Sequence, residues 1–395
     1  MKTVSSIQWG GFVAVLMTLC VVGCGGGGTT VVDNSAAASS DGSWHWDLPK
    51  NFPQPQVPAD NPMSEAKFQL GRRLFYDTRL SGNGTKACAS CHFQNLAFTD
   101  GKAFSTGSTG QQTTRSAMGI ANSVYHPTLT WGNPTLTSLE KQMEVPLLAS
   151  EPVEMGINEG NRELVLQRFR DDSDYVARFK AVFPADAQPI NLQNVIKAIA
   201  TFQRGILSGN SRFDRYQRGE ATLTTDELRG LNLFNSEKAE CFHCHSGFNF
   251  NDQVVYTGAR VVETPFHNTG LYNLGGNGDY PAPNRGVYEV SHKLSDMGAF
   301  RAQSLRNVAL TAPYMHDGSI ATLEEVLDFY AAGGRNITSG IYAGDGRANP
   351  YKSELIALID LNAQEKADIV AFLKTLSDDG LLSNPRFANP FNTTP

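Results

Sequence analysis

The chain has 395 residues, of which 41% are hydrophobic and 18% charged, so its composition is that of a globular protein with room for two domains. Its formal net charge is −6, and it contains no long basic run and no block of like charges. These features exclude the charge pattern of a nucleic-acid-binding protein and favour a protein or a small molecule as partner.

The first residues have the pattern of an export signal. Lys2 is the only charge before an apolar stretch over residues 10–22, which predicts a signal peptide over residues 1–23. The sequence Val21-Val22-Gly23-Cys24 resembles the lipobox of bacterial lipoproteins and predicts lipid attachment at Cys24. Acyl chains would hold the protein on the periplasmic side of a membrane. The alternative is a plain secretory signal and a soluble periplasmic protein.

Residues 24–60 predict a flexible tether followed by a strap. Residues 25–43 are rich in Gly, Ser, Thr and Ala and are too poor in large apolar groups to pack. The segment from Trp44 to Pro62 is rich in proline and aromatic residues, which predicts an extended strap over the surface.

The cysteines predict two covalently attached c-type haems. Two of the six belong to the signal and its lipobox, and the other four form two C-x-x-C-H motifs, Cys88-Ala-Ser-Cys91-His92 and Cys241-Phe-His-Cys244-His245. Two thiols at this spacing add to the haem vinyl groups, while the next residue directs its imidazole at the iron. A zinc site is the alternative, since paired cysteines also bind zinc. A histidine directly after both motifs, together with export, favours haem.

The surroundings of the two motifs repeat. Gly71-Arg-Arg-Leu-Phe75 precedes the first motif and Gly230-Leu-Asn-Leu-Phe234 the second, and Phe98-Thr-Asp100 is matched by Phe250-Asn-Asp252 with a one-residue gap. Thr137 and Thr322 each precede a predicted helix in which the threonine caps and a glutamate reaches back. This repetition predicts tandem haem domains over residues 61–214 and 215–380, with a tail over residues 381–395.

Helical periodicity dominates and strand-like alternation is scarce, so the predicted fold class is mainly α, with two tandem cytochrome c-like haem domains and long loops. The predicted helices are Ser64–Tyr76, Arg162–Phe183 with a break near Asp171–Asp174, Leu192–Leu207, Thr225–Asn235, Leu323–Ala332 and Glu365–Leu376. The polar run Ser208-Gly-Asn210 follows the third of these helices and predicts a hinge between the domains.

Residues 62–376 resemble the bacterial di-haem cytochrome c peroxidase and MauG superfamily. The resemblance rests on Leu70-Gly-Arg-Arg-Leu-Phe-Tyr-Asp77, on Ser81-Gly-Asn-Gly84, on Ser211-Arg-Phe-Asp-Arg-Tyr216 and on the run from Ser304 to Gly318. It implies that the N-terminal haem meets peroxide and that the C-terminal haem stores or relays electrons. A tryptophan between the haems is also implied, and Trp131 occupies its position.

The resemblance also implies the iron ligands. His92 and His245 are the proximal ligands, and Tyr330 occupies the position of the second haem's sixth ligand, where peroxidases have methionine and MauG-like enzymes tyrosine. A phenolate ligand should lower the haem potential. The loop over residues 104–114 lacks the histidine that blocks the first iron in peroxidases, so this iron is expected to be open. His126 is the rival distal ligand.

Peroxide activation needs a group that moves a proton between the two oxygens. The family's distal glutamate segment resembles residues 151–156, so Glu154 is the candidate acid, with Gln142 and Pro146 at the preceding distal positions. The interval from Pro146 to Glu154 is longer than in the peroxidases, which leaves Glu151 as the alternative.

A calcium ion is a further implication of the resemblance. The family binds calcium through carbonyl groups at the positions of Thr311 and Pro313 and through an asparagine, and oxygen ligands of this kind suit calcium. Ser116 occupies the asparagine position, and Asn122 lies nearby in the sequence.

Within the superfamily, residues 114–125, 129–136 and 151–156 are most similar to the MbnH branch. That similarity implies that hydrogen peroxide drives both haems to a shared high-valent state, which oxidises a periplasmic partner protein at tryptophan. Two alternatives remain open. The first is a cytochrome c peroxidase that receives electrons from a small cytochrome or a copper protein. The second is a non-enzymatic di-haem electron carrier.

Overall fold

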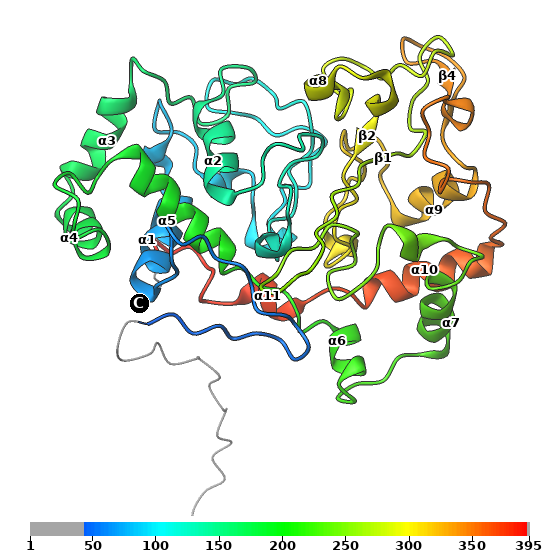
Figure 1. The fold of residues 1–395 in the computed structure, drawn as a ribbon, viewed down its shortest axis with the longest axis horizontal. Coiled ribbons are helices and arrows are strands. Elements are labelled where there is room, and N and C mark those ends of the chain that lie inside the picture. The colour runs from blue at the N-terminus through cyan, green and yellow to red at the C-terminus, as the bar shows by residue number, and fades with distance from the viewer. Residues whose placement is uncertain (1–42, 393–395) are drawn as a thin grey trace, which may run out of the picture. The chain divides into compact units, whose positions relative to one another are not determined.

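The computed structural model of the chain describes residues 43–392 (Figure 1). The predicted signal peptide and the predicted lipidation site Cys24 lie outside the described residues. The regular elements are mostly helices, which confirms a mainly α protein. They are α1 Glu65–Tyr76, α2 Leu139–Leu148, α3 Arg162–Arg170, α4 Ser173–Val182, α5 Leu192–Arg204, α6 Arg212–Gln217, α7 Thr225–Phe234, α8 Tyr288–Ser291, α9 Leu323–Ala331, α10 Ala363–Lys374 and α11 Asp379–Ser383.

The strands in the described residues are short and pair in twos. Strand β1 (His267–Asn268) pairs antiparallel with β2 (Ala299–Phe300), and β3 (Asn336–Ile337) pairs antiparallel with β4 (Gly344–Asp345). Much of the remaining chain forms loops and single 3-10 turns, as predicted.

Helix caps explain why the predicted helices begin where they do. Ser64 caps α1 by accepting a hydrogen bond from the Lys67 amide, and Thr322 and Glu325 form a reciprocal capping box at α9. The predicted break within Arg162–Phe183 is present, since α3 ends at Arg170 and Asp172 caps α4.

One predicted cap is wrong. Helix α2 is capped by Ser138 and not by Thr137, and Ser138 Oγ accepts from the Lys141 amide at 3.2 Å. Glu140 does not reach back to the cap. Its carboxylate instead binds the buried Arg204 guanidinium at 2.6 Å, because an enclosed cation needs an anionic partner.

The buried apolar side chains form separate cores along the chain. The largest core draws on residues from Phe68 to Ile206, and a second draws on residues from Phe213 to Leu376. The change of core lies beside the predicted boundary at residue 215, while the division into two domains stays a prediction. The predicted tail returns to the first core, because Leu381 and Phe387 pack there (Figure 1).

The same close helix crossing occurs in both halves. Helix α1 packs on α5, and α7 packs on α10. A Cβ atom placed on Gly71 of α1 would lie 1.9 Å from the Ala198 carbonyl oxygen, and one placed on Gly230 of α7 would lie 1.9 Å from the Asp368 carbonyl oxygen. Glycine is therefore required at both crossings because the two backbones touch, which explains the repeated Gly-x-x-Leu-Phe pattern.

A second repeated feature fixes the loop that follows each haem-binding motif. Asn122 and Asn307 both adopt a left-handed conformation, with φ of 59° and 63°. The Asn122 amide donates to the Ile206 carbonyl just after α5, and the Asn307 amide donates to the Leu376 carbonyl just after α10. The segments around these two asparagines are therefore structural counterparts, a correspondence that the sequence analysis missed.

The predicted strap contacts the first core and a residue next to the second core. Trp44 packs against Phe68 of the first core, with ring centroids 5.2 Å apart. Phe52 contacts Phe248, which precedes Phe250 of the second core, at a centroid distance of 4.8 Å. Within residues 43–392, no helix combines the length and the apolar character that a membrane span requires.

The helix crossing yields a stability prediction. Gly71→Ala should lower the free energy of unfolding by about 1–3 kcal/mol, because the new methyl group forces two backbones apart and overpacking of this kind outweighs the better helix propensity of alanine. Chemical denaturation of the haem-loaded protein measures the change. Gly160→Ala is the control, since its Cβ would meet only the Asn158 side chain at 3.3 Å. An equal effect of both substitutions would contradict the crossing argument.

Candidate functional site

The first C-x-x-C-H motif forms a tight turn that presents both thiols and the imidazole. Cys88 begins a 3-10 turn, and the His92 amide donates back to the Cys88 carbonyl at 3.1 Å. The His92 Nδ1 atom lies 2.7 Å from the carbonyl oxygen of Phe98. With Nδ1–H as the donor to this carbonyl, the Nε2 lone pair is left for a metal.

The second motif repeats this arrangement. Cys241 begins the corresponding turn, and His245 Nδ1 lies 3.2 Å from the carbonyl oxygen of Phe250. Phe98 and Phe250 are both left-handed, with φ of 63° and 50°, and this conformation turns their carbonyls toward the imidazoles. The one-residue difference between the two flanks is thus accommodated within the loops.

The first cysteine of each motif is partly buried. Burial raises the pKa of Cys88 and of Cys241 to about 12, and the Glu154 carboxylate adds to the shift at Cys88. Within the described part of the chain, no cluster of metal-binding atoms contains cysteines from both motifs. This finding argues against the four-cysteine zinc alternative.

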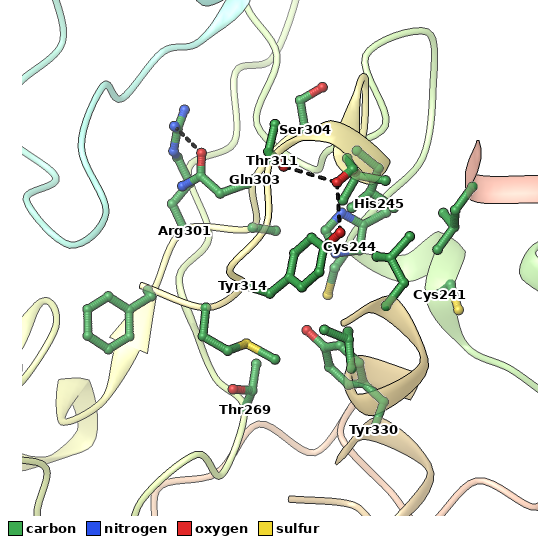
Figure 2. A pocket seen from close by; sticks show the side chains of 18 of the residues that line it. Cys241, Cys244, His245, Thr269, Arg301, Gln303, Ser304, Thr311, Tyr314 and Tyr330 are labelled. Carbon is green, nitrogen blue, oxygen red and sulfur yellow. Dashed lines mark hydrogen bonds between the residues drawn. The ribbon is translucent and has the colours of Figure 1, made fainter. Parts of the chain in front are cut away.

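A cavity of about 270 Å³ lies beside the second motif (Figure 2). Figure 2 shows His245 and Tyr330 on opposite sides of this space, with the Tyr330 hydroxyl directed into it from α9. Burial raises the pKa of Tyr330, so the phenol keeps its proton unless a metal ion replaces it. The lining includes Trp131, Thr269, Leu305, Thr311, Tyr314 and Leu327.

Unpaired polar atoms around this cavity fit a haem. Arg301 Nε, Gln303 Nε2 and His316 Nε2 are buried, and none has a hydrogen-bond partner within the protein. Buried polar atoms without partners are costly, so they indicate a missing polar group. Haem propionates would supply acceptors, and the macrocycle would occupy the apolar remainder. Arg301, Cys241, Cys244, His245 and Tyr330 would hold the group.

The first half has a proline at the position equivalent to Tyr330. Counted from the caps of α2 and α9, Pro146 lies eight residues after Ser138 and Tyr330 eight residues after Thr322. Proline offers no side-chain ligand atom. The prediction is an open iron at the first site and a sixth ligand at the second. It agrees with proline on one helix and tyrosine at the equivalent position of the other.

The structure brings the predicted distal residues together. Gln142 and Pro146 lie one turn apart on α2, and therefore on the same face. The Met155 amide donates to the Pro146 carbonyl at 2.9 Å, which places Glu154 beside that helix. Burial raises the pKa of Glu154, whereas Glu151 is exposed. Glu154 is the better candidate for a proton donor and acceptor.

The histidine-free loop packs against the same segment. The Ser108 amide donates to the Glu154 carbonyl at 2.7 Å, and Gln111 Oε1 accepts from the Val153 amide at 2.7 Å. The rival ligand His126 is buried, and its Nε2 is hydrogen-bonded to Asn249 Nδ2 at 3.1 Å. This bond gives His126 a role within the fold.

Trp131 is held between segments of both halves. Its indole Nε1–H donates to the Ser116 carbonyl at 2.9 Å, and its own carbonyl accepts from the Arg301 amide at 2.8 Å. Ser116 and Arg301 belong to the equivalent loops that lead to Asn122 and Asn307. The position agrees with the predicted bridging tryptophan, although its role stays a prediction.

The predicted calcium ligands come together only in part. Ser116 Oγ donates to the Met315 carbonyl at 3.2 Å, close to Pro313 in the sequence, and Thr311 and Pro313 line the cavity. The Asn122 side chain instead makes two hydrogen bonds to the Ser208 main chain, at 2.8 Å each, so its amide is used within the fold. A calcium site stays a prediction.

Two repeated sites of this geometry define a protein built to hold two c-type haems. The chain belongs to the di-haem cytochrome c peroxidase family, whose sequence pattern matches residues 65–222. The cytochrome-c peroxidase IdrP1 of Denitromonas iodatirespirans is 38% identical over 341 residues, which are 82% of this chain and 85% of that protein. MauG of Methylorubrum extorquens is 32% identical over 331 residues, which are 83% and 82% of the two chains.

Solved structures agree with this assignment. A MauG-like protein associated with microbial copper homeostasis matches with a TM-score of 0.87 and 58% identity, over 88% of this chain and all of that chain. The di-haem peroxidase BthA of Burkholderia thailandensis shares the fold, with a TM-score of 0.64 at 22% identity over 83% and 90% of the two chains. The protein is an enzyme, a di-haem oxidoreductase that acts with hydrogen peroxide.

One ion pair at the second site was not found from the sequence. His267 Nε2 lies 2.6 Å from Asp252 Oδ2, and each of these side chains has an atom within 4.8 Å of the Cys244 sulfur. Burial alone would lower the pKa of His267, but hydrogen bonds with Asp252 and Cys244 raise it to about 10. The sequence pointed to Asp252, because Phe250-Asn-Asp252 repeats Phe98-Thr-Asp100. No local sequence pattern connects Asp252 with His267.

This pair gives a pH prediction. The folded-state pKa of His267 is above its unfolded value, so the pair stabilises fully below about pH 6.5 and the contribution is lost as the pH rises toward 10. Asp252→Asn should lower the free energy of unfolding by about 2–3 kcal/mol at pH 6 and by less at pH 10. Denaturation at both pH values measures this, with Asp360→Asn at an exposed carboxylate as control. An equal loss at both pH values would refute the assignment.

Proposed function

We propose that this protein uses hydrogen peroxide to oxidise a partner protein, at tryptophan, in the manner of MauG-like enzymes. The observation that carries the proposal is Tyr330, which faces His245 across the second cavity where a peroxidase would present methionine. A proline at the equivalent position of α2 leaves the first site without such a ligand.

Two c-type haems would supply the redox chemistry of peroxide reduction when bound. The chain's own residues handle the protons. Burial raises the pKa of Glu154, which favours the protonated carboxyl group that would pass a proton to the leaving oxygen of peroxide. Gln142 on the neighbouring face of α2 would orient the oxidant. Each peroxide takes two electrons and two protons and leaves as two water molecules.

The second site is arranged to retain an oxidising equivalent. An anionic phenolate donates more electron density than a thioether, so ligation by Tyr330 would favour the oxidised state of the metal. Its hydroxyl proton must leave when the ligand bond forms, because burial keeps the free phenol protonated. Trp131, held by Ser116 and Arg301, would couple the two sites electronically.

The second candidate is a cytochrome c peroxidase that receives electrons from a small cytochrome or a copper protein. The 38% identity to IdrP1, which is named a cytochrome-c peroxidase, is the observation that favours it. The 58% identity to a MauG-like protein favours the partner-oxidising function. We further propose that the enzyme acts in the periplasm and is attached to the membrane through lipid on Cys24.

The distal acid gives a kinetic prediction. Glu154→Gln keeps the size of the side chain but removes the titratable proton, so the rate of reaction with peroxide should fall by about 10²–10⁴. Stopped-flow spectroscopy of the haem-loaded protein measures the rate. Glu151→Gln is the matched control and should leave it unchanged. If Glu151→Gln is the slower variant, the two roles are reversed.

The proposed function is tested by comparing wild type with Tyr330→Met. One equivalent of hydrogen peroxide added to the as-isolated diferric wild type should abolish the paramagnetic resonance signals of both haems. Tyr330→Met should need prior reduction, and Tyr256→Met at an exposed tyrosine should behave as wild type. A wild type that needs prior reduction would identify a cytochrome c peroxidase instead.

The product is sought in a periplasmic extract of the native host. Treatment with hydrogen peroxide and wild-type enzyme should oxidise a tryptophan in one protein, and in isotopically labelled water any oxygen added to that tryptophan should carry the label. Mass spectrometry detects the change in mass, and Tyr330→Met should not produce it. Absence of oxidised tryptophan from every extract protein would contradict partner oxidation.

A further inference from the structure

A continuous series of aromatic rings leads away from Trp131. The Trp131 ring lies 6.5 Å from the His316 ring between centroids, and the Tyr280 ring also lies 6.5 Å from His316. Phe300 stacks on His316 at 3.8 Å and fixes the orientation of that ring. Trp131 and Tyr280 are therefore separated by a single intervening ring.

The series continues from Tyr280 to the surface. The Tyr272 ring lies 5.5 Å from Tyr280, and the Tyr342 ring lies 5.7 Å from Tyr272. Tyr280 and Tyr272 are buried, with 3% and 5% of their surface exposed, whereas Tyr342 belongs to the loop between β3 and β4 and is 43% exposed. These contacts connect the interior of the site with the solvent.

We propose that Tyr280, Tyr272 and Tyr342 relay electrons from the surface to Trp131, and that Tyr342 is the point at which an aromatic side chain of a partner protein delivers them. The inference rests on the proposed function, because the oxidant that draws electrons through Trp131 is the oxidising equivalent that the reaction with peroxide would leave in the protein. Each transfer moves one electron from the surface toward Trp131, so two transfers supply the two electrons that reduce one peroxide.

The hydrogen-bond partners of the two tyrosines give them different parts in the relay: the carboxylate at Tyr272 can accept its proton, whereas Tyr280 faces a neutral amide and keeps its proton while it bridges Tyr272 and Trp131. The Tyr272 hydroxyl donates to Asp317 Oδ2 at 2.6 Å, while the Tyr280 hydroxyl donates to the amide oxygen of Asn268 at 2.8 Å. Oxidation of Tyr272 would send its electron toward Trp131 and its proton to the Asp317 carboxylate. When an electron arrives from Tyr342, the proton returns to Tyr272 and the residue is restored.

Burial and Asp317 raise the pKa of Tyr272, so the residue keeps its proton until the ring is oxidised, and two nearby groups then favour loss of that proton. Burial alone would raise the pKa of Asp317, but His316 and the hydrogen bonds from Tyr272 and Ser319 lower it, so the carboxylate is ionised and can accept a proton. The Arg335 guanidinium lies 5.1 Å from the centre of the Tyr272 ring. A cation at this position opposes a positively charged ring, so the electron and the proton must leave together.

The outer end suits contact with another protein. Tyr342 follows Ile341, which is 86% exposed, at the tip of the loop over residues 338–343. An exposed apolar and aromatic tip is typical of contact residues in protein interfaces. The fitting partner is a protein that presents an oxidisable tryptophan or tyrosine at its surface.

The relay is tested without any partner. Haem-loaded enzyme is treated with peroxide and a nitroso radical trap, and peptide mass spectrometry locates the adducts. We expect an adduct on Tyr342 that falls several-fold in Tyr280→Phe and in Tyr272→Phe, since phenylalanine keeps the packing but resists oxidation. The controls are Tyr125→Phe, a buried tyrosine in another contact group, and Tyr256→Phe, an exposed one. Neither should change the Tyr342 adduct.

The outcomes separate the relay from the proposed function. Peroxide consumption with no adduct on Tyr342, or with an adduct that Tyr280→Phe and Tyr272→Phe leave unchanged, would overturn the relay. Folding of each variant is checked by its haem spectrum and its denaturation midpoint. A Tyr342 adduct that depends on both residues would support the relay even if no extract protein is oxidised, and in that case only the proposed substrate class would fall.

Discussion

The hydrogen bond from each proximal imidazole to a main-chain carbonyl is the interaction on which both sites depend. His92 and His245 each meet the carbonyl of a left-handed phenylalanine, which favours the tautomer that leaves Nε2 available to the predicted haem iron. The loops after the motifs can then differ in length and chemistry without disturbing the ligand. The glycine crossings of α1 with α5 and of α7 with α10 keep the helices behind these loops in a constant arrangement.

The two halves share this arrangement of helices and loops, but they differ at the position that would supply a sixth ligand to the haem iron. Pro146 and Tyr330 occupy equivalent places on α2 and α9, so one helix offers no ligand and the other offers a phenol. The distal segment with Glu154 is hydrogen-bonded to α2 and to the loop over residues 104–114. In the proposed function, the first site would react with peroxide and the second would hold the oxidising equivalent, with Trp131 between segments of both.

Local patterns were sufficient for the features that depend on nearby residues. The C-x-x-C-H turns, the cap at Thr322 and the repeated Gly-x-x-Leu-Phe helices are decided within a few positions of the chain, so they could be predicted. The pair of His267 with Asp252, the unpaired Nε atom of Arg301 and the strap contacts of Phe52 depend on residues far apart in sequence. For the same reason Asn122 was expected near a calcium ion, whereas its amide is hydrogen-bonded to Ser208.

The most direct test of the account concerns the coupling of the two sites through Trp131. One equivalent of peroxide is added to diferric wild type and to Trp131→Phe, and paramagnetic resonance spectra are recorded as the reaction proceeds. The account predicts that wild type loses the signals of both haems together, whereas Trp131→Phe retains the signal of the second haem. Loss of both signals in Trp131→Phe at the wild-type rate would contradict it.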